Sequence, residues 1–420
     1  MHLRKPAILA VCFVALSLPV LANDWPQWRG PDRTDVSKET GLLKLWPDKG
    51  PRLLWTYREA GVGYSGPAIV GDRLFTMGAE EKVDTIYALD SRTGKRLWMT
   101  EIAPRVELDR GDGPRGTPTV DGDRGYAIGS QGELVCVEVA SGKKQWSVNL
   151  VKDLGGARPS WGFSESPLVD GDKVICTPGG SKGTLAALDK KTGKVLWRSD
   201  VTYPAHYSSA IVAEVGSTRQ YIQLTRNGVF GVAAADGKLL WESKLGGCGT
   251  AAIPTPIFHD GYVFVTSGYR DSKDGLIKLS ATNGKVTAKD VYSGRTLVNK
   301  HGGVVFLNGV LYGNSEDDGP WVAMDFLTGK KLGWSGRNLS IGSITYADGR
   351  FYLYSEDDGT VVLLEPNPKE WKEAGRFRIP ETTTVPRRSG HVWTHPVVAN
   401  GRLYLRDQDL IFCYDVRVTN

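Results

Sequence analysis

The stretch Ala88-Leu89-Asp90-Ser91-Arg92-Thr93-Gly94-Lys95-Arg96-Leu97-Trp98 decides the fold, because versions of it recur along the chain. The recurring centre is Gly-Lys after a small or acidic residue, and its glycines are 48, 51, 44, 47 and 45 residues apart: Gly94, Gly142, Gly193, Gly237, Gly284 and Gly329. Four copies end in a tryptophan: Trp98, Trp146, Trp197 and Trp241. A fixed period of this size is the signature of a repeat architecture.

A second element recurs in phase with the first. It consists of an apolar strand, a turn glycine and another apolar strand, and its eight glycines are Gly71, Gly122, Gly171, Gly216, Gly261, Gly309, Gly349 and Gly401. Glycine at such a turn supplies the positive φ that a tight hairpin needs. Each unit therefore predicts four short antiparallel strands, which is the size of a propeller blade. The tryptophans are large enough to fill the seams between blades.

The two ends of the repeat array are incomplete in complementary ways. Residues 51–57 read as the last strand of a unit, whereas residues 395–416 read as three strands that lack a fourth. Joining them would complete a blade and remove an exposed sheet edge. We therefore predict an all-β fold, an eight-bladed β-propeller of four-stranded antiparallel blades over residues 51–420, with the ring closed by an N-terminal strand.

The first residues predict a secretory signal peptide. Arg4 and Lys5 precede an apolar run over residues 6–20, and cleavage is expected after Ala22. A retained anchor is the alternative, but the run is shorter than the ~20 residues that a spanning helix needs. The expected domains are thus a signal peptide over residues 1–22, an N-terminal extension over residues 23–50 and the propeller, and the predicted location is periplasmic or secreted.

Charge and cysteine content exclude several classes. The whole chain has 52 Lys and Arg against 47 Asp and Glu, a balance that by itself argues neither for nor against nucleic acid; no basic block occurs, and no nucleic-acid partner is expected. No later segment is apolar enough to suggest a membrane span. Four cysteines follow the signal, without metal-finger spacing: Cys136, Cys176, Cys248 and Cys413. Buried free thiols are expected, although an oxidising compartment would permit a disulfide.

The A-L-D-x-x-T-G-K-x-L-W pattern resembles the PQQ-like propeller repeat family. That family includes quinoprotein alcohol dehydrogenases and the propeller lipoprotein of the outer-membrane β-barrel assembly machinery. Residues 24–31 resemble the leader of secreted members, and Trp25 and Trp28 are expected to pack on the ring exterior or to cap one face. The resemblance implies the fold, but it does not specify an activity.

For the members that oxidise alcohols, the resemblance implies PQQ above the ring centre. It also implies a calcium ion on Glu, Asn and Asp ligands, an Asp base, and often a disulfide between adjacent cysteines. No two cysteines are adjacent here, and no such ligand set can be aligned residue by residue. PQQ with calcium therefore stays an open alternative.

A candidate site emerges from the inner loops, by which we mean the loops that lead into the innermost strand of each blade. Four of the five histidines after the signal fall in these loops. The candidate ligand- or cofactor-binding residues are Arg115, Trp161, Glu165, His206, Lys300, His301, Trp393 and His395. Residues at the same position in each repeat lie on the same face of a closed ring. We therefore predict that these side chains converge in a polar, aromatic funnel for an anionic or carbonyl-bearing ligand. The alternative is that they only satisfy one another, with Glu165 in a structural ion pair.

Metal and hydrolytic sites have weaker support. Residues 316–319 and 356–359 form near-identical acidic turns that suit calcium, but repeated hairpins explain them equally well. A histidine-based metal site is disfavoured because the loops come from different blades, so no metal is assigned. No H-E-x-x-H, G-x-S-x-G or P-loop motif occurs.

Three functions remain open. The first is a protein-interaction or ligand-binding scaffold of the cell envelope, whose partners are envelope proteins or a small molecule. The second is a quinoprotein-type oxidoreductase, and the third is a carbohydrate or small-ligand binder.

Overall fold

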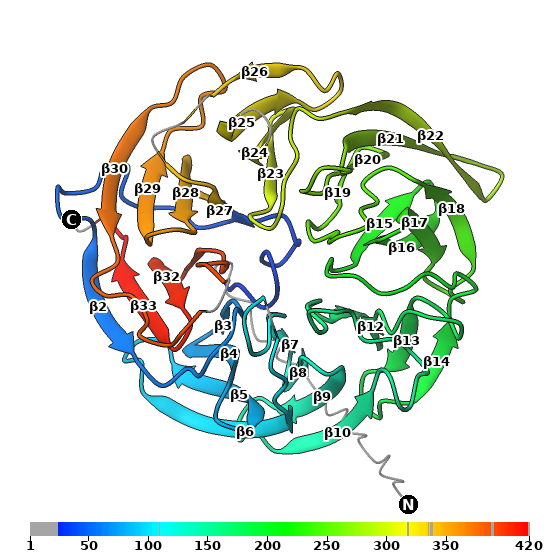
Figure 1. Cartoon of the computed structure of the whole chain (residues 1–420), viewed down its shortest axis with the longest axis horizontal. Coiled ribbons are helices and arrows are strands. Elements are labelled where there is room, and N and C mark those ends of the chain that lie inside the picture. Colours follow the sequence, from blue (N-terminus) through cyan, green and yellow to red (C-terminus); the bar gives the residue numbers. More distant parts are fainter. Residues whose placement is uncertain are drawn as a thin grey trace, which may run out of the picture.

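The computed structural model describes residues 24–418 except 109, 317–318, 335, 337–338 and 388–389. The predicted signal peptide and the central aspartates of the first acidic turn lie outside the described residues. Within the described part, regular structure consists of β-strands grouped into eight sheets around a central axis (Figure 1). No helix of the described residues is long and apolar enough to cross a membrane.

Each blade is an antiparallel meander that runs from the axis outward. The first four blades are β3 (Ala68–Val70), β4 (Arg73–Ala79), β5 (Val83–Asp90) and β6 (Arg96–Pro104); β7 (Thr119–Asp121), β8 (Arg124–Ile128), β9 (Glu133–Glu138) and β10 (Lys144–Asn149); β11 (Leu168–Asp170), β12 (Lys173–Cys176), β13 (Ala186–Asp189) and β14 (Val195–Arg198); and β15 (Ile211–Val215), β16 (Thr218–Thr225), β17 (Gly228–Ala233) and β18 (Leu239–Ser243).

The second half of the ring repeats this pattern. Blades 5 to 7 are β19 (Ile257–His259), β20 (Tyr262–Val265), β21 (Asp274–Thr282) and β22 (Lys285–Gly294); β23 (Val304–Leu307), β24 (Val310–Ser315), β25 (Gly319–Asp325) and β26 (Lys331–Gly333); and β27 (Gly342–Ala347), β28 (Arg350–Ser355), β29 (Thr360–Leu364) and β30 (Glu373–Arg378). The eight predicted turn glycines all adopt positive φ, between 55° and 81°.

The eighth blade confirms the predicted closure. Three of its strands are C-terminal: β31 (Val397–Ala399), β32 (Arg402–Asp407) and β33 (Leu410–Asp415). The fourth is β2 (Arg52–Tyr57), which pairs antiparallel with β33, for example Thr56 with Phe412. The seam to blade 1 is held by Arg406, which is 1% exposed and donates to the carbonyl oxygens of Ser65 and Met77.

The other seams follow the repeat. The indole of Trp98 packs on Gly142, the glycine of the Gly-Lys pair in the next blade, and donates to the Val139 carbonyl at 3.1 Å. Trp55, Trp146, Trp197 and Tyr292 pack on the equivalent glycines of their neighbours. The repeat predicts that these tryptophans are buried between blades, but Trp98, Trp146 and Trp197 are half-buried, because these seams reach the outer rim. Trp241 is 5% exposed and instead donates to Gln220 of its own blade.

The N-terminal extension differs most from expectation. Residues 25–39, the central segment, run through the middle of the ring rather than over its exterior or across one face (Figure 1). Within it β1 (Val36–Ser37) pairs parallel with β27, so the sheet of blade 7 has five strands instead of four. Hydrogen bonds of the central segment reach every blade: Ile69, Val120, Pro167, Ala210, Thr255, Val304, Tyr346 and Val398.

These contacts have a physical reason. The innermost strand of each blade would otherwise present unpaired backbone groups to the axis. Two buried arginines of the central segment, Arg29 and Arg33, each donate to carbonyl oxygens of two neighbouring blades.

The described cysteines are buried and unpaired in four different parts of the ring.

Candidate functional site

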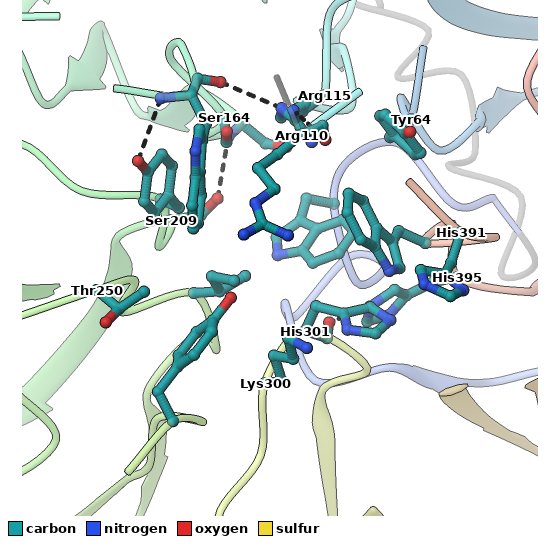
Figure 2. A pocket seen from close by; sticks show the side chains of 17 residues that line it. Tyr64, Arg110, Arg115, Ser164, Ser209, Thr250, Lys300, His301, His391 and His395 are labelled. Carbon is teal, nitrogen blue, oxygen red and sulfur yellow. Dashed lines mark hydrogen bonds between the residues drawn. The ribbon is translucent and has the colours of Figure 1, made fainter. Parts of the chain in front are cut away.

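The inner loops and the central segment enclose a cavity of about 260 Å³ on the axis (Figure 2). Six aromatic side chains line it: Trp28, Tyr64, Trp161, Tyr207, Tyr269 and Trp393. Its basic and imidazole side chains are Arg110, Arg115, Lys300, His301, His391 and His395. Its remaining lining residues are Ser164, Ser166, Ser209, Thr250 and Ile253. Among the described residues that line the cavity there is no carboxylate.

The cations are held in place by aromatic faces and by backbone oxygens. The Arg115 guanidinium lies 5.0 Å from the Tyr64 ring centroid and 6.0 Å from that of Trp393, and it donates to the Trp161 carbonyl at 3.2 Å. The Lys300 ammonium lies 5.3 Å from the Tyr269 ring centroid, and its Nζ lies 3.5 Å from Glu316 Oε1, outside the cavity lining. Cation–π contacts of this kind hold a cation over the face of a ring. Figure 2 shows the two arginines across the cavity from Lys300.

The aromatic side chains form two walls. The rings of Trp161 and Tyr207 are stacked, with centroids 5.4 Å apart, on one side. Tyr64 and Trp393 lie 5.1 Å apart on another. Such faces accept a flat ring by stacking.

The central segment contributes part of the cavity wall. Trp28 donates to Thr255 Oγ1 at 2.9 Å, and its ring lies 4.5 Å from that of His395. His395 Nδ1 lies 3.4 Å from Asp35 Oδ2, and its Nε2 lies 3.1 Å from the His301 carbonyl oxygen. The extension therefore positions one of the cavity's histidines as well as filling the channel.

A second cluster borders the cavity. His301 Nε2 lies 3.2 Å from Glu356 Oε2, and the Trp393 indole donates to the same oxygen at 2.9 Å. Burial raises the pKa of Glu356 to about 7 and lowers that of His301 well below its usual range. Both groups are therefore driven towards their uncharged forms.

The structure brings six of the eight candidate residues to this cavity. Arg115, Trp161, Lys300, His301, Trp393 and His395 line it, whereas Glu165 and His206 do not. Glu165 accepts hydrogen bonds from the Thr177 amide at 2.5 Å and hydroxyl at 2.6 Å. Burial raises its pKa to about 7, and Arg33 opposes that rise.

His206 also turns away from the cavity. Its Nδ1 accepts a hydrogen bond from the Ala252 amide at 2.9 Å, and its ring stacks beside Tyr207. Burial lowers its pKa to about 4. Both residues lie in the inner loops, at the expected position in the repeat. Position in the repeat determines which loop holds a residue, but it does not determine the direction of the side chain.

The candidate list left out several residues of the site, among them Trp28, Tyr269 and Glu356, although the sequence marked the acidic turn of Glu356 as a possible calcium site. Tyr269 lies in the β20–β21 connection and Glu356 in the β28–β29 turn, which reach the same face as the inner loops. Trp28 was missed because nothing in a leader sequence indicates that it will fold back into the ring.

The family follows from a sequence comparison. A family model described as outer membrane protein assembly factor BamB matches residues 36–156 and 156–332, together more than half of the chain. The chain belongs to this family. The matched repeats form blades 1 to 6. The similarity to the family therefore extends over most of the ring and is not confined to the residues of the cavity.

The individual relatives of the chain include BamB proteins and an enzyme. The chain is 25% identical to BamB of Yersinia pestis over 71% of each chain, and 27% identical to BamB of Burkholderia pseudomallei over 48% of this chain and 50% of that relative. It is 31% identical to lupanine 17-hydroxylase [cytochrome c] of a Pseudomonas species, over 42% of this chain and 27% of that enzyme. The chain thus spans half or less of the length of two of these relatives.

Solved structures share the fold at low identity. BamB from Moraxella catarrhalis superposes with a TM-score of 0.61 at 18% identity, covering 87% of this chain and 99% of that one. Quinohemoprotein alcohol dehydrogenase from Comamonas testosteroni gives 0.61 at 14% identity, covering 95% and 81%. These likenesses establish an eight-bladed propeller.

The cavity does not fit the calcium–quinone centre that the resemblance implies. Calcium takes six to eight oxygen ligands, commonly carboxylates. The described lining offers hydroxyls, imidazoles and cations instead of carboxylates. The described cysteines are also unpaired. We therefore derive no redox step through that centre.

Proposed function

We propose that this protein is a ligand-binding propeller of the cell envelope whose central cavity takes a flat, anionic small molecule. The observation that carries the proposal is the lining itself, with aromatic faces and three cationic side chains but no carboxylate among the described residues. Stacking would hold the ring of such a ligand, and charge-assisted hydrogen bonds would hold its carboxylates.

The size of the cavity supports a small molecule. A volume of about 260 Å³ is close to the lower end of ligand pockets, which run from roughly 300 to 1,000 Å³. Trp28 and Arg29 of the central segment are hydrogen-bonded to Thr255 at the cavity wall, so we expect a ligand to enter from the face of the inner loops. A secreted or periplasmic location is part of the proposal, since the expected signal peptide supports it.

A binding screen tests the proposal. The chain without residues 1–22, treated with a chelator, would be screened by tryptophan fluorescence against aromatic carboxylates, their alcohol analogues, oligosaccharides and PQQ. Saturable quenching by flat carboxylates, but not by the alcohols, is expected. Quenching by oligosaccharides alone would refute the anionic assignment, and the absence of any saturable response would refute ligand binding.

A protein-interaction scaffold is the second candidate, favoured by a separate observation. Half-buried apolar side chains, including Val212, Phe258 and Phe306, line another hollow of about 610 Å³ beside the central segment. Family membership also supports this role. Affinity purification from cross-linked envelopes would test it, and substituting Phe258 and Phe306 by serine should remove the partner. Retention of the same partner by this variant would contradict it.

A further inference from the structure

Three metal-binding side chains meet beside the cavity, and a fourth, His301, contacts one of them, Glu356. His301 comes from the loop before β23, Glu356 and Asp357 from the β28–β29 turn, and His391 from the loop before β31. One ligand atom each of Glu356, Asp357 and His391 lie within 4.8 Å of one another. The sequence disfavoured such a site because the loops belong to different blades, but neighbouring blades bring them together.

The spacing of these atoms suits a tetrahedral ion. Zinc binds imidazole nitrogen and carboxylate oxygen at about 2.0–2.2 Å, which places two tetrahedral ligand atoms about 3.4 Å apart. His301 Nε2 lies 3.2 Å from Glu356 Oε2, and His391 Nδ1 lies 3.5 Å from Asp357 Oδ1. Each of these two pairs therefore has the spacing of two ligand atoms on one ion.

His301 supplies an independent observation. Its side chain is only 9% exposed, and its Nε2 faces the Glu356 carboxylate yet has no hydrogen-bond partner among the described residues. A buried polar atom without a partner is costly. An ion between the imidazole nitrogen and the carboxylate oxygen would give His301 Nε2 a partner.

Hydrogen bonds from neighbouring side chains also orient the carboxylates of Glu356 and Asp357. The Trp393 indole donates to Glu356 Oε2 at 2.9 Å, and the Ser340 hydroxyl donates to Asp357 Oδ2 at 2.5 Å. Hydrogen bonds to metal-binding carboxylates commonly fix their direction and tune their affinity.

We propose that His301, Glu356, Asp357 and His391 bind one divalent transition-metal ion of the zinc class at the rim of the cavity. Two nitrogen and two oxygen donors favour zinc over calcium or magnesium, which prefer oxygen ligands throughout. The site does not depend on the small molecule proposed above. His301 and His391 also line the cavity, so the ion lies next to any ligand bound there.

Titration with metal ions alone tests the proposal. The chain without residues 1–22, stripped with a chelator and dialysed, would be titrated with Zn²⁺ by calorimetry and with Co²⁺ by absorption spectroscopy. We expect one ion per chain and the intense visible bands of tetrahedral Co²⁺. Glu356→Gln and His391→Ala should each weaken Zn²⁺ binding by about tenfold or more.

The control is an exposed histidine–carboxylate pair. His259 Nε2 lies 3.4 Å from Asp260 Oδ2 in a hairpin turn, so His259→Ala should leave Zn²⁺ binding unchanged. The absence of saturable binding, full binding in both cluster variants, or loss in His259→Ala would overturn the proposal. If a variant fails to fold by circular dichroism, the wild-type stoichiometry and Co²⁺ bands still decide. The ligand screen uses metal-free protein, so the two proposals can fail separately.

Discussion

Arg29 Nε lies 2.7 Å from Asp35 Oδ2 at the centre of the ring, and both side chains are 1% exposed. Arg29 also donates to backbone oxygens of blades 5 and 6, while the same Asp35 carboxylate faces His395 of the cavity. One buried ion pair thus links the central segment, the inner strands and the candidate site.

Breaking this pair should destabilise the protein. Arg29→Ala leaves a buried carboxylate without its partner, so the free energy of unfolding in urea should fall by about 3–5 kcal/mol. Asp32→Asn is the control, because Asp32 and its partner Lys38 are 58% and 59% exposed. Its effect should stay under about 1 kcal/mol. Equal effects of the two variants would show that the central segment does not support the ring.

The seam that closes the ring gives a second prediction. Arg406→Met removes a buried cation and leaves the carbonyl oxygens of Ser65 and Met77 without a donor. We expect a loss of about 3–5 kcal/mol in the free energy of unfolding. Arg52→Ala, on the exposed edge of the same blade, should cost under about 1 kcal/mol. A melting temperature that is unchanged in Arg406→Met would contradict this account.

Two glycines separate backbone strain from seam packing. Gly122 and Gly142 have φ of 59° and 74°, so alanine should cost about 1–2 kcal/mol at either position through backbone strain. A Cβ on Gly142 would lie 2.5 Å from the Trp98 ring, whereas one on Gly122 would meet no described residue within 4 Å. Gly142→Ala should therefore cost a further 1–3 kcal/mol, roughly. Chemical denaturation of both variants measures the difference, which should vanish if the seam is loosely packed.

Glu165 predicts a pH dependence of stability. Burial raises its pKa from 4.5 to about 7, so the folded state holds the proton more tightly than the unfolded state. Its contribution to stability is fully present below about pH 4.5 and is lost as the pH rises through 7. Relative to Glu165→Gln, the wild type should lose about 3 kcal/mol across that range. Urea unfolding at closely spaced pH values would reveal it, and a constant difference between the two proteins would rule it out.

The repeat explains why so much of the ring could be predicted. Gly71 and its seven equivalents mark hairpins by local backbone chemistry, and the incomplete unit at residues 51–57 has a single geometric solution in a closed ring. Both features are encoded within a few residues. They are therefore visible without any knowledge of tertiary contacts.

The site could be predicted only in part, for a related physical reason. The phase of the repeat places Arg115 and His395 on the right face, but the direction of a side chain depends on its neighbours. Glu165 turns to Thr177, and His206 accepts a hydrogen bond from Ala252. The path of Trp28 depends on contacts more than 200 residues away along the chain, such as the one to Thr255, and no local pattern indicates them.

The most direct test of the central claim compares two ligands of the same shape and different charge. Calorimetry would measure naphthalene-2,6-dicarboxylate and naphthalene-2,6-dimethanol against the wild type, Arg115→Met, Lys300→Met and the surface control Lys38→Met. We predict that the dicarboxylate binds once per chain, about tenfold or more tighter than the diol, and that only the two cavity variants lose this preference. Equal binding of the two compounds, or an unchanged preference in Arg115→Met and Lys300→Met, would contradict an anion-binding cavity.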